Sequence, residues 1–288
     1  MQRWLNKVLA VAAMASLSPS ILRSQEIHWY TNFDEAKTDA LAHDRFMIVY
    51  FEQSSSDRSF KMNSGTWNQL PVIEQAEKLI CVKIDDDQMR VSNDLMWKLK
   101  NEKLATRYRV EYLPLTVFID PLGSVIARAE GCVASEDLTR MMKALPKDLT
   151  RLFVALRNLD AKSDDAPLTI SVGDAYHAIG MAQLSNQYYR QADDADTVKR
   201  DPILAEHIHT FTALNYRLLG DLQKCIRLLE EGLDRYPKSE NRPAQLFLLT
   251  KFYLEDTDEI KAREYATILQ NVYPGNKYAT MAQDLFKR

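Results

Sequence analysis

Residues 108–120 read YRVEYLPLTVFID, and this stretch decides how the first half of the chain folds. A helical pattern ends near Tyr108, and the apolar run 115–119 that follows has the length of a buried strand. Pro114 stands directly before this run, where its missing N–H takes no hydrogen bond from a sheet. The segment therefore predicts a loop that enters a strand. Cis geometry costs only about 0.5–1 kcal/mol before a proline, so packing against a neighbouring turn can select a cis peptide bond between Leu113 and Pro114. We expect this cis bond, and a trans proline at the joint is the alternative.

The residues on both sides of this joint alternate between strand and helix patterns. Apolar runs predict strands over 27–30, 46–51, 79–84 and 124–129, the last joined to 115–119 by a turn with Pro121 and Gly123. Helices are expected over 33–43 with Asn32 as the cap, up to about 78, over 93–108, and from a cap at Ser135 to about 145. Parallel strands come first and an antiparallel hairpin last, so the order predicts an α/β domain with a central mixed sheet and flanking helices.

A serine-rich turn follows the strand 46–51. Residues 49–53 read VYFEQ, and the turn continues as Ser56-Asp57-Arg58-Ser59 before a helix. Together with residues 82–85 and 108–120, this pattern resembles a thioredoxin-like domain over residues 25–146. The resemblance places the family's Cys-x-x-Cys pair at Ser56 and Ser59, or at Asp57 and Phe60 if the alignment shifts by one residue.

The resemblance also places the family's cis-proline loop at Leu113 and Pro114. Leu115 is a mild departure, because the family more often has Thr directly after the proline. The loop borders a groove where backbone groups can pair with an extended peptide.

Neither alignment supplies a thiol at the redox position. Disulfide exchange needs an attacking thiolate and a second, resolving thiol, and a serine hydroxyl can replace neither. An activated serine is not indicated, because no histidine lies between His43 and His177 and no G-x-S-x-G motif occurs. We expect no catalytic residue in this turn, and we expect its hydroxyls to cap the helix that follows.

The three cysteines do not restore the motif. Cys81 lies in a strand pattern and Cys225 on an amphipathic helix, and both are expected to be buried as small apolar residues. Cys132 follows the hairpin, and we expect it, like Cys81, to lie away from the active-site edge, although a structural or regulatory pair of these two remains an alternative. At least one thiol stays free unless it pairs with another chain.

No cofactor or metal site is predicted. His207 and His209 are two positions apart, so their rings diverge on a helix. The acidic run 85–87 lacks the alternating oxygen ligands and the glycine of a calcium loop.

Residues 1–24 have the proportions of a secretory signal. Arg3, Lys7 and Arg23 accompany the apolar run 8–17, and the segment contains no acid. The run is shorter than the roughly 20 apolar residues that cross a bilayer. Cleavage after Ala15 or Ser24 would leave the mature chain in the periplasm or secreted, and an uncleaved amino-terminal anchor is the alternative. No later stretch is apolar enough to span a membrane.

After residue 146 the strand patterns stop. A linker helix is expected over 147–165, and helices of 12–16 residues fill 166–288. Three times, a small residue is followed three positions later by an aromatic and nine positions after that by another small residue. The three sets are Gly173, Tyr176, Ser185; Ala213, Tyr216, Cys225; and Thr250, Tyr253, Ala262. This spacing resembles tetratricopeptide repeats, with the helix 278–287 as a terminal cap. A plain helical-bundle core is the alternative.

The composition of the chain argues against two classes of function, nucleotide binding and nucleic-acid binding. The chain of 288 residues has 37 Lys or Arg and 40 Asp or Glu, and it contains neither common nucleotide-binding glycine motif. This balance of charges argues against nucleic acid as the main partner.

The two resemblances imply an exported thioredoxin-like protein that lacks the redox pair and binds proteins or peptides as an adaptor or chaperone-like module. The alternatives are a thiol–disulfide oxidoreductase that uses non-standard cysteines, and a second half that serves only for dimerisation.

Overall fold

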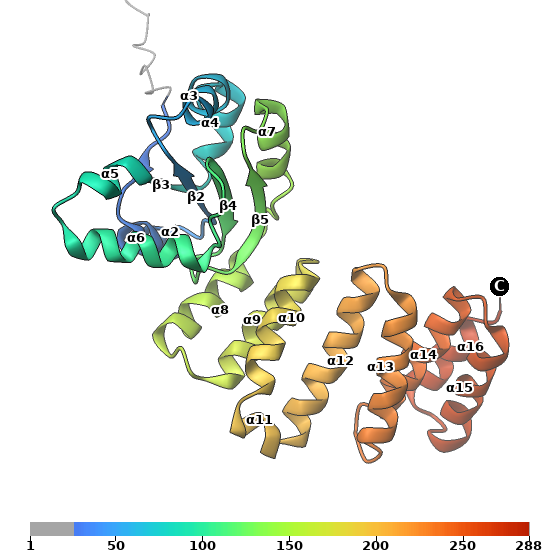
Figure 1. The fold of residues 1–288 in the computed structure, drawn as a ribbon. Coiled ribbons are helices and arrows are strands. Elements are labelled where there is room, and N and C mark those ends of the chain that lie inside the picture. The colour runs from blue at the N-terminus through green and yellow to red at the C-terminus, as the bar shows by residue number, and fades with distance from the viewer. Residues whose placement is uncertain (1–25, 288) are drawn as a thin grey trace, which may run out of the picture. The chain divides into compact units, whose positions relative to one another are not determined.

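The computed structural model describes residues 26–287 (Figure 1), so the predicted signal segment lies outside the described residues. The first half contains a five-stranded sheet in the order β1-β3-β2-β4-β5. Its strands are β1 (Trp29–Tyr30), β2 (Met47–Glu52), β3 (Ile80–Asp85), β4 (Leu115–Ile119) and β5 (Val125–Glu130). β3 pairs in parallel with both β1 and β2. Within the turn that joins β4 to β5, Asp120 N–H donates to Ser124 O at 3.0 Å. The predicted mixed sheet is confirmed.

The strands form where the sequence has continuous apolar runs. Every residue of β2 and β4 is buried, as is expected of strands covered on both faces. The helices of this half are α2 (Phe33–Ala42), α3 (Asp57–Met62), a π-helical turn η2 (Asn63–Trp67), α4 (Leu70–Ala76), α5 (Asp86–Val91), α6 (Leu95–Arg107) and α7 (Ser135–Lys143). Asn32 caps α2 as predicted, its Oδ1 accepting from Asp34 N–H at 3.0 Å. The predicted cap at Ser135 is wrong by one residue, because Ser135 is the first residue of α7 and Ala134 occupies the cap position.

The second half is helical from residue 150 onward. Its helices are α8 (Thr150–Ala161), α9 (Ala166–Ala178), α10 (Ala182–Asp193), α11 (Asp196–Arg200), α12 (Pro202–Leu218), α13 (Leu222–Arg235), α14 (Arg242–Glu255), α15 (Glu259–Val272) and α16 (Lys277–Asp284). Figure 1 shows the pairs α9/α10, α12/α13 and α14/α15 following one another along the chain, with α16 last.

The repeat spacing places small residues where two helices meet. Ser185, Cys225 and Ala262 lie at corresponding positions of the second helix of each pair, and each is 0% exposed. Gly173 shows why small residues are needed, because a Cβ there would lie 2.5 Å from Cε1 of Tyr189 in the partner helix. The close approach of paired helices therefore depends on these positions.

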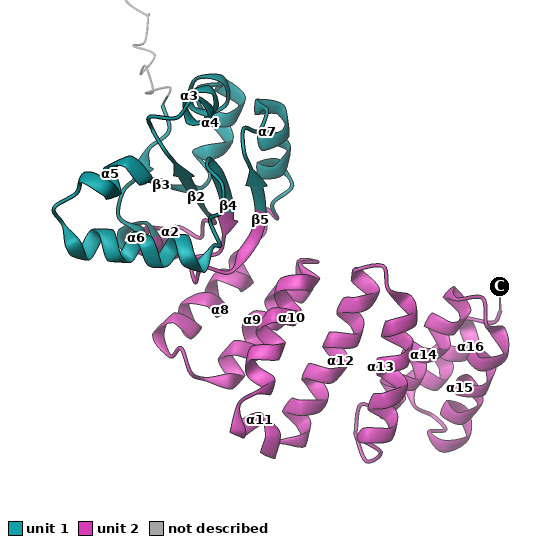
Figure 2. Ribbon diagram, in the orientation of Figure 1, with its two compact units in different colours: residues 1–36, 47–117, 128–145 teal, residues 37–46, 118–127, 146–288 magenta. Residues whose placement is uncertain are grey.

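The chain divides into two compact units, and the division does not fall at a single position (Figure 2). Unit 1 comprises residues 1–36, 47–117 and 128–145, and unit 2 comprises 37–46, 118–127 and 146–288. The segment 37–46 packs on α8: Phe46 and Phe153 lie 5.8 Å apart between ring centroids, and Lys37 pairs with Asp160 at 2.6 Å. α8 is thus packed into unit 2 and does not run free between two domains.

A buried carboxylate connects the turn after β4 to the first helix pair within unit 2. Asp120 is 0% exposed, and its Oδ2 accepts from the hydroxyls of Tyr176 at 2.7 Å and Tyr188 at 2.9 Å. Its Oδ1 accepts from Ser124 N–H at 2.9 Å. Burial raises the pKa of Asp120 above its ordinary value, and the hydrogen bonds from Ser124, Tyr176 and Tyr188 offset only part of that effect.

The raised pKa of Asp120 predicts a pH dependence of stability. The unfolded chain loses this proton near pH 4, whereas the folded chain keeps it to a higher pH. The contribution of Asp120 to the free energy of unfolding is therefore greatest below about pH 4 and falls as the pH rises through the pKa of the folded state. We expect Asp120→Asn to flatten this fall in urea unfolding followed by circular dichroism. Asp164→Asn, at an exposed position, is the matched control. An unchanged slope in Asp120→Asn would contradict the prediction.

Candidate functional site

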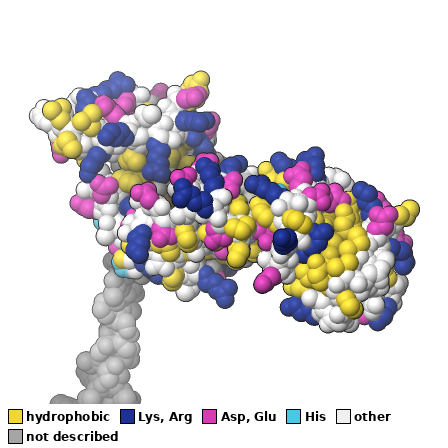
Figure 3. Space-filling model, turned by 90° about the horizontal axis from the view of Figure 1, so that it is seen from below, with side chains coloured by type: hydrophobic (Ala, Val, Ile, Leu, Met, Phe, Trp, Pro, Cys, Tyr) yellow, Lys and Arg dark blue, Asp and Glu magenta, His cyan; other side chains and the backbone are white. Residues whose placement is uncertain are grey.

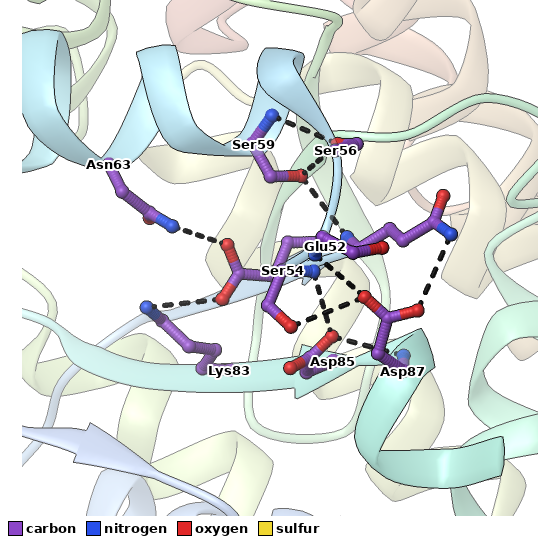
Figure 4. Close-up of polar contacts among 10 residues, drawn as sticks. Glu52, Ser54, Ser56, Ser59, Asn63, Lys83, Asp85 and Asp87 are labelled. Carbon is purple, nitrogen blue, oxygen red and sulfur yellow. Dashed lines mark hydrogen bonds and ion pairs between the residues drawn. The ribbon is translucent and has the colours of Figure 1, made fainter.

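The serine turn between β2 and α3 is held by its own hydroxyl groups (Figure 4). Ser56 is the N-cap of α3, and its Oγ accepts from Ser59 N–H at 3.1 Å. The two hydroxyl oxygens are 3.0 Å apart, and Ser59 Oγ also accepts from Gln53 N–H at 3.1 Å. The predicted capping role is confirmed. Both hydroxyls are engaged in closing the turn, and Ser59 is 0% exposed.

Two aspartates from the acidic run anchor the same turn from the side of β3. Asp85 Oδ1 accepts from Ser54 N–H at 3.0 Å, and Asp87 Oδ2 accepts from Ser55 N–H at 2.7 Å. The hydrogen bonds from Ser55 lower the pKa of Asp87, because they favour the ionised carboxylate. The acidic run therefore fixes the backbone of the serine turn, a role that its sequence pattern did not indicate.

A partly buried ion pair lies beneath α3. Glu52 is 4% exposed, and its carboxylate meets Lys83 Nζ at 3.3 Å and accepts from Asn63 Nδ2 at 2.6 Å. Lys83 Nζ also lies 4.9 Å from the ring centroid of Trp29, a cation–π distance. In the sequence, the sign of this site is a glutamate at the end of a buried strand. A buried charge needs such partners, so Lys83 and Asn63 satisfy a constraint that Glu52 creates.

The proline loop connects to the serine turn through the segment after β5. The peptide bond between Leu113 and Pro114 is cis, as predicted. Gly131 N–H donates to Pro114 O at 2.8 Å, and the next residue, Cys132, donates from Sγ to Arg58 O at 3.1 Å. Residues 131 and 132 thus bridge the proline loop and the first turn of α3.

The expectation that Cys132 lies away from the active-site edge is wrong. Gly131 adopts φ of 73°, and this conformation brings the chain beside α3, where Cys132 is exposed. Cys81 and Cys225 are buried, as predicted, and all three cysteines are free. Burial raises the pKa of Cys81 to about 12 and that of Cys225 to about 11.

Apolar surface surrounds this turn. Phe60 on α3 is 69% exposed, and Tyr112 on the proline loop is 68% exposed. A cavity of about 170 Å³ lies beside the loop, lined by Phe51, Glu52, Ile84, Asp86, Met89, Ala105, Val110, Glu111 and Leu113. The arrangement offers apolar contacts and carboxylates to a bound chain, and the turn itself presents no thiol.

A larger groove lies in unit 2. It has a volume of about 530 Å³ and is lined by residues of β5, α10 and α12. Gln183, Gln187 and Arg190 recur at helical spacing on α10, and all three are exposed. Val125 and Ile126 of the terminal strand β5 line the groove as well, so it combines a cation, amides and apolar side chains.

The histidine pair has separate partners, as predicted. His207 Nε2 lies 2.7 Å from Asp174 Oδ1, and His209 Nε2 lies 2.7 Å from Leu228 O. Burial disfavours the ionised form of Asp174, but hydrogen bonds from His207 and Tyr189 outweigh it and lower the pKa. Within residues 26–287, no group of three or more His, Cys, Asp or Glu side chains is placed to hold a metal ion.

Comparisons with known proteins find a family for part of the chain. The family described as "Thioredoxin-like domain" matches residues 33–146. Two solved structures are similar to part of this chain: "DsbH Oxidoreductase" (TM-score 0.35, 21% identity, 42% of this chain and 85% of that one) and a thioredoxin from Thermus thermophilus (TM-score 0.34, 23% identity, 41% and 85%). A third, from work on Pseudomonas aeruginosa pilF, has a TM-score of 0.25 and 14% identity and covers 52% of this chain and 75% of its own.

No curated protein matches the chain. The family match ends at residue 146, where the strand patterns of the sequence stop. The chain therefore has an α/β thioredoxin-like fold with a mixed sheet, followed by an all-α domain of tetratricopeptide-like helix pairs.

Because Ser56 caps α3, replacing it should lower the stability of the folded chain by a measurable amount. Replacing it with alanine removes the acceptor for Ser59 N–H and the partner of Ser59 Oγ. We expect Ser56→Ala to lower the free energy of unfolding by about 1 kcal/mol, the usual cost of losing an N-cap. Ser163→Ala, in an exposed loop between α8 and α9, is the control and should change it by less than about 0.5 kcal/mol. Equal effects of the two substitutions in urea unfolding would contradict the capping role.

Proposed function

We propose that this chain is an exported protein- or peptide-binding adaptor with a chaperone-like role, in which the thioredoxin-like domain has lost its redox pair. The observation that carries this proposal is the pair of hydroxyls at Ser56 and Ser59, 3.0 Å apart at the start of α3. Side chains at these two positions touch across one helical turn, which supports their correspondence with the family's two cysteines. Asp57 and Phe60, the pair in the shifted alignment, are both exposed, and Phe60 projects to solvent.

Chemistry at this turn does not support redox catalysis. Ser56 and Ser59 donate and accept within the turn, and a hydroxyl forms no mixed disulfide. No described histidine or carboxylate accepts from either hydroxyl, so the turn also lacks the base that a serine nucleophile needs.

Binding is supported by the surface that remains around the turn. Phe60 on α3 and Tyr112 on the proline loop are each more than two thirds exposed. Large aromatic side chains dominate the free energy of protein interfaces, and the proline loop offers backbone groups to an extended chain. The groove on α10, with the exposed guanidinium of Arg190, is the corresponding feature of the helical domain. These features favour recognition of unfolded or extended polypeptide.

The proposed localisation of the protein rests on the sequence of residues 1–24. A basic start and a short apolar run support export to the periplasm or the medium. No helix within residues 26–287 is long and apolar enough to cross a membrane.

One observation favours a second candidate, a thiol–disulfide oxidoreductase that uses Cys132. This thiol is exposed and hydrogen-bonded to Arg58 O at 3.1 Å, within the turn that replaces the redox motif. The other two thiols are buried, and burial raises the pKa of each, so neither would supply a thiolate at neutral pH.

Reductase activity separates the two candidates. We expect the chain to reduce insulin no faster than dithiothreitol alone, because Ser56 and Ser59 carry no sulfur. Ser56→Cys with Ser59→Cys should create a dithiol couple that titrates in a glutathione redox buffer and accelerates the reaction. Activity in the native chain that disappears in Cys132→Ser would instead establish the oxidoreductase. A double-cysteine variant without a redox couple would favour the alignment at Asp57 and Phe60.

Binding to an unfolded chain tests the adaptor function directly. The probe is fluorescently labelled, reduced and carboxymethylated α-lactalbumin, measured by anisotropy. We expect Phe60→Ser with Tyr112→Ser to weaken binding by about tenfold, because each substitution removes an exposed aromatic contact. Ile260→Ser on α15, where the side chain is 76% exposed, is the matched control. Affinity that is the same in all three proteins would count against the proline-loop surface.

A further inference from the structure

The connection between α5 and α6 carries an exposed apolar cluster that the proposed function does not use. Val91 is 80% exposed, Leu95 70%, Met96 66% and Leu99 51%. Figure 1 shows that this connection lies at the outer end of the two helices, away from the sheet of unit 1. We call these four residues the α5–α6 tip. Four large apolar side chains within nine residues, each more than half exposed, are unusual on a protein surface that meets only water.

The tip is rigid where it meets the domain. Asp94 caps α6, accepting from Met96 N–H and Trp97 N–H at 3.0 Å each. Trp97 Nε1 donates to Thr31 O at 3.1 Å, and Lys100 pairs with Asp34 at 2.5 Å. These contacts hold α6 against the start of α2, so the apolar side chains are presented by a fixed helix end.

The helix α6 carries more positive than negative charge. Residues 95–107 contain four Lys or Arg and one Glu, and Lys100 pairs with Asp34. On α5, Arg90 pairs with Asp86. Lys98 and Lys103 lie on α6 and make no ion pair with any described residue. On the face seen in Figure 3, hydrophobic side chains lie interspersed with both basic and acidic ones.

A shallow hollow adjoins the tip on the same helix. It has a volume of about 400 Å³ and is lined by Leu99, Glu102, Lys103, Thr106 and Arg107. Lys103 and Arg107 are one helical turn apart and flank it, with the apolar Leu99 at the end nearest the tip. Glu102 is the single acid in its lining.

From this juxtaposition we infer that the α5–α6 tip docks on the surface of an anionic phospholipid membrane. The apolar side chains enter the boundary of the acyl chains, while Lys98, Lys103 and Arg107 meet the phosphate groups. An amphipathic helix with Lys or Arg beside exposed Leu binds membrane interfaces by this combination of apolar burial and electrostatic attraction. The tip is a projecting helix end without an exposed Trp or Tyr, and the exposed arginine beside it, Arg90, is paired with Asp86.

Vesicle sedimentation tests the inference. The chain from residue 25 onward is used, because the apolar run 8–17 would itself enter lipid. We expect it to sediment with phosphatidylglycerol vesicles at low salt, to dissociate at high salt, and not to sediment with phosphatidylcholine vesicles. Leu95→Ser with Met96→Ser, and separately Lys103→Glu with Arg107→Glu, should each weaken binding by about tenfold or more. Controls at exposed positions of the helical domain are Ile260→Ser for the apolar pair and Lys251→Glu for the charged pair.

Results that differ from these expectations contradict the inference. Absence of binding to phosphatidylglycerol would do so, as would equal losses in the tip variants and the controls. A dimer in light scattering that becomes a monomer in Leu95→Ser with Met96→Ser, without lipid binding, would assign the tip to a second copy of the chain. Circular dichroism of every variant separates loss of binding from loss of fold, and the charge pair tests the same surface without changing its apolar residues.

Discussion

The packing of the turn after β4 against the first helix pair depends on the buried carboxylate of Asp120. A carboxylate with no exposed surface must receive hydrogen bonds from groups that are buried with it. Here Tyr176 on α9 and Tyr188 on α10 supply two of them, and their rings stack with centroids 5.5 Å apart. Both helices must therefore present a tyrosine to the same point, which requires the close packing of α9 and α10 that Gly173 permits. The compact units divide within β4 as well as at residue 146, and the turn after this strand belongs to the same unit as α9 and α10.

The same physical rule organises the serine turn. Asp85 and Asp87 accept from backbone N–H groups of the turn, and Glu52 is balanced by Lys83 and Asn63. Carboxylates at the ends of β2 and β3 thus fix a loop whose hydroxyls close on each other. A turn built in this way keeps its conformation without sulfur chemistry, because its geometry comes from hydrogen bonds to ionised groups, which are stronger than those between neutral groups. The conformation of the serine turn is therefore set by these carboxylates.

Features fixed by local spacing could be predicted from the sequence, and features fixed by distant partners could not. Pro114 before an apolar run predicted the strand β4, and the resemblance to thioredoxin-like domains predicted the cis bond before it. The small residues of the helix pairs followed from their regular recurrence. Asp120, by contrast, looked like an ordinary turn residue, since its tyrosine partners are 56 and 68 positions away. The predicted position of Cys132 was wrong because the backbone conformation of Gly131 decides in which direction the chain leaves β5.

The buried networks and the exposed surfaces of this protein make separate contributions to its stability and to its interactions. Asp120, Glu52 and Ser59 are each at most 4% exposed and hold elements together, so their replacement acts on folding. Phe60, Tyr112 and the α5–α6 tip are mostly exposed and make few contacts within the fold, so their replacement should change the free energy of unfolding by no more than about 0.5 kcal/mol. Keeping large apolar side chains in water brings no stability to the folded chain. The proposed function assigns a polypeptide to the surface at the proline loop, and the further inference assigns a lipid surface to the tip.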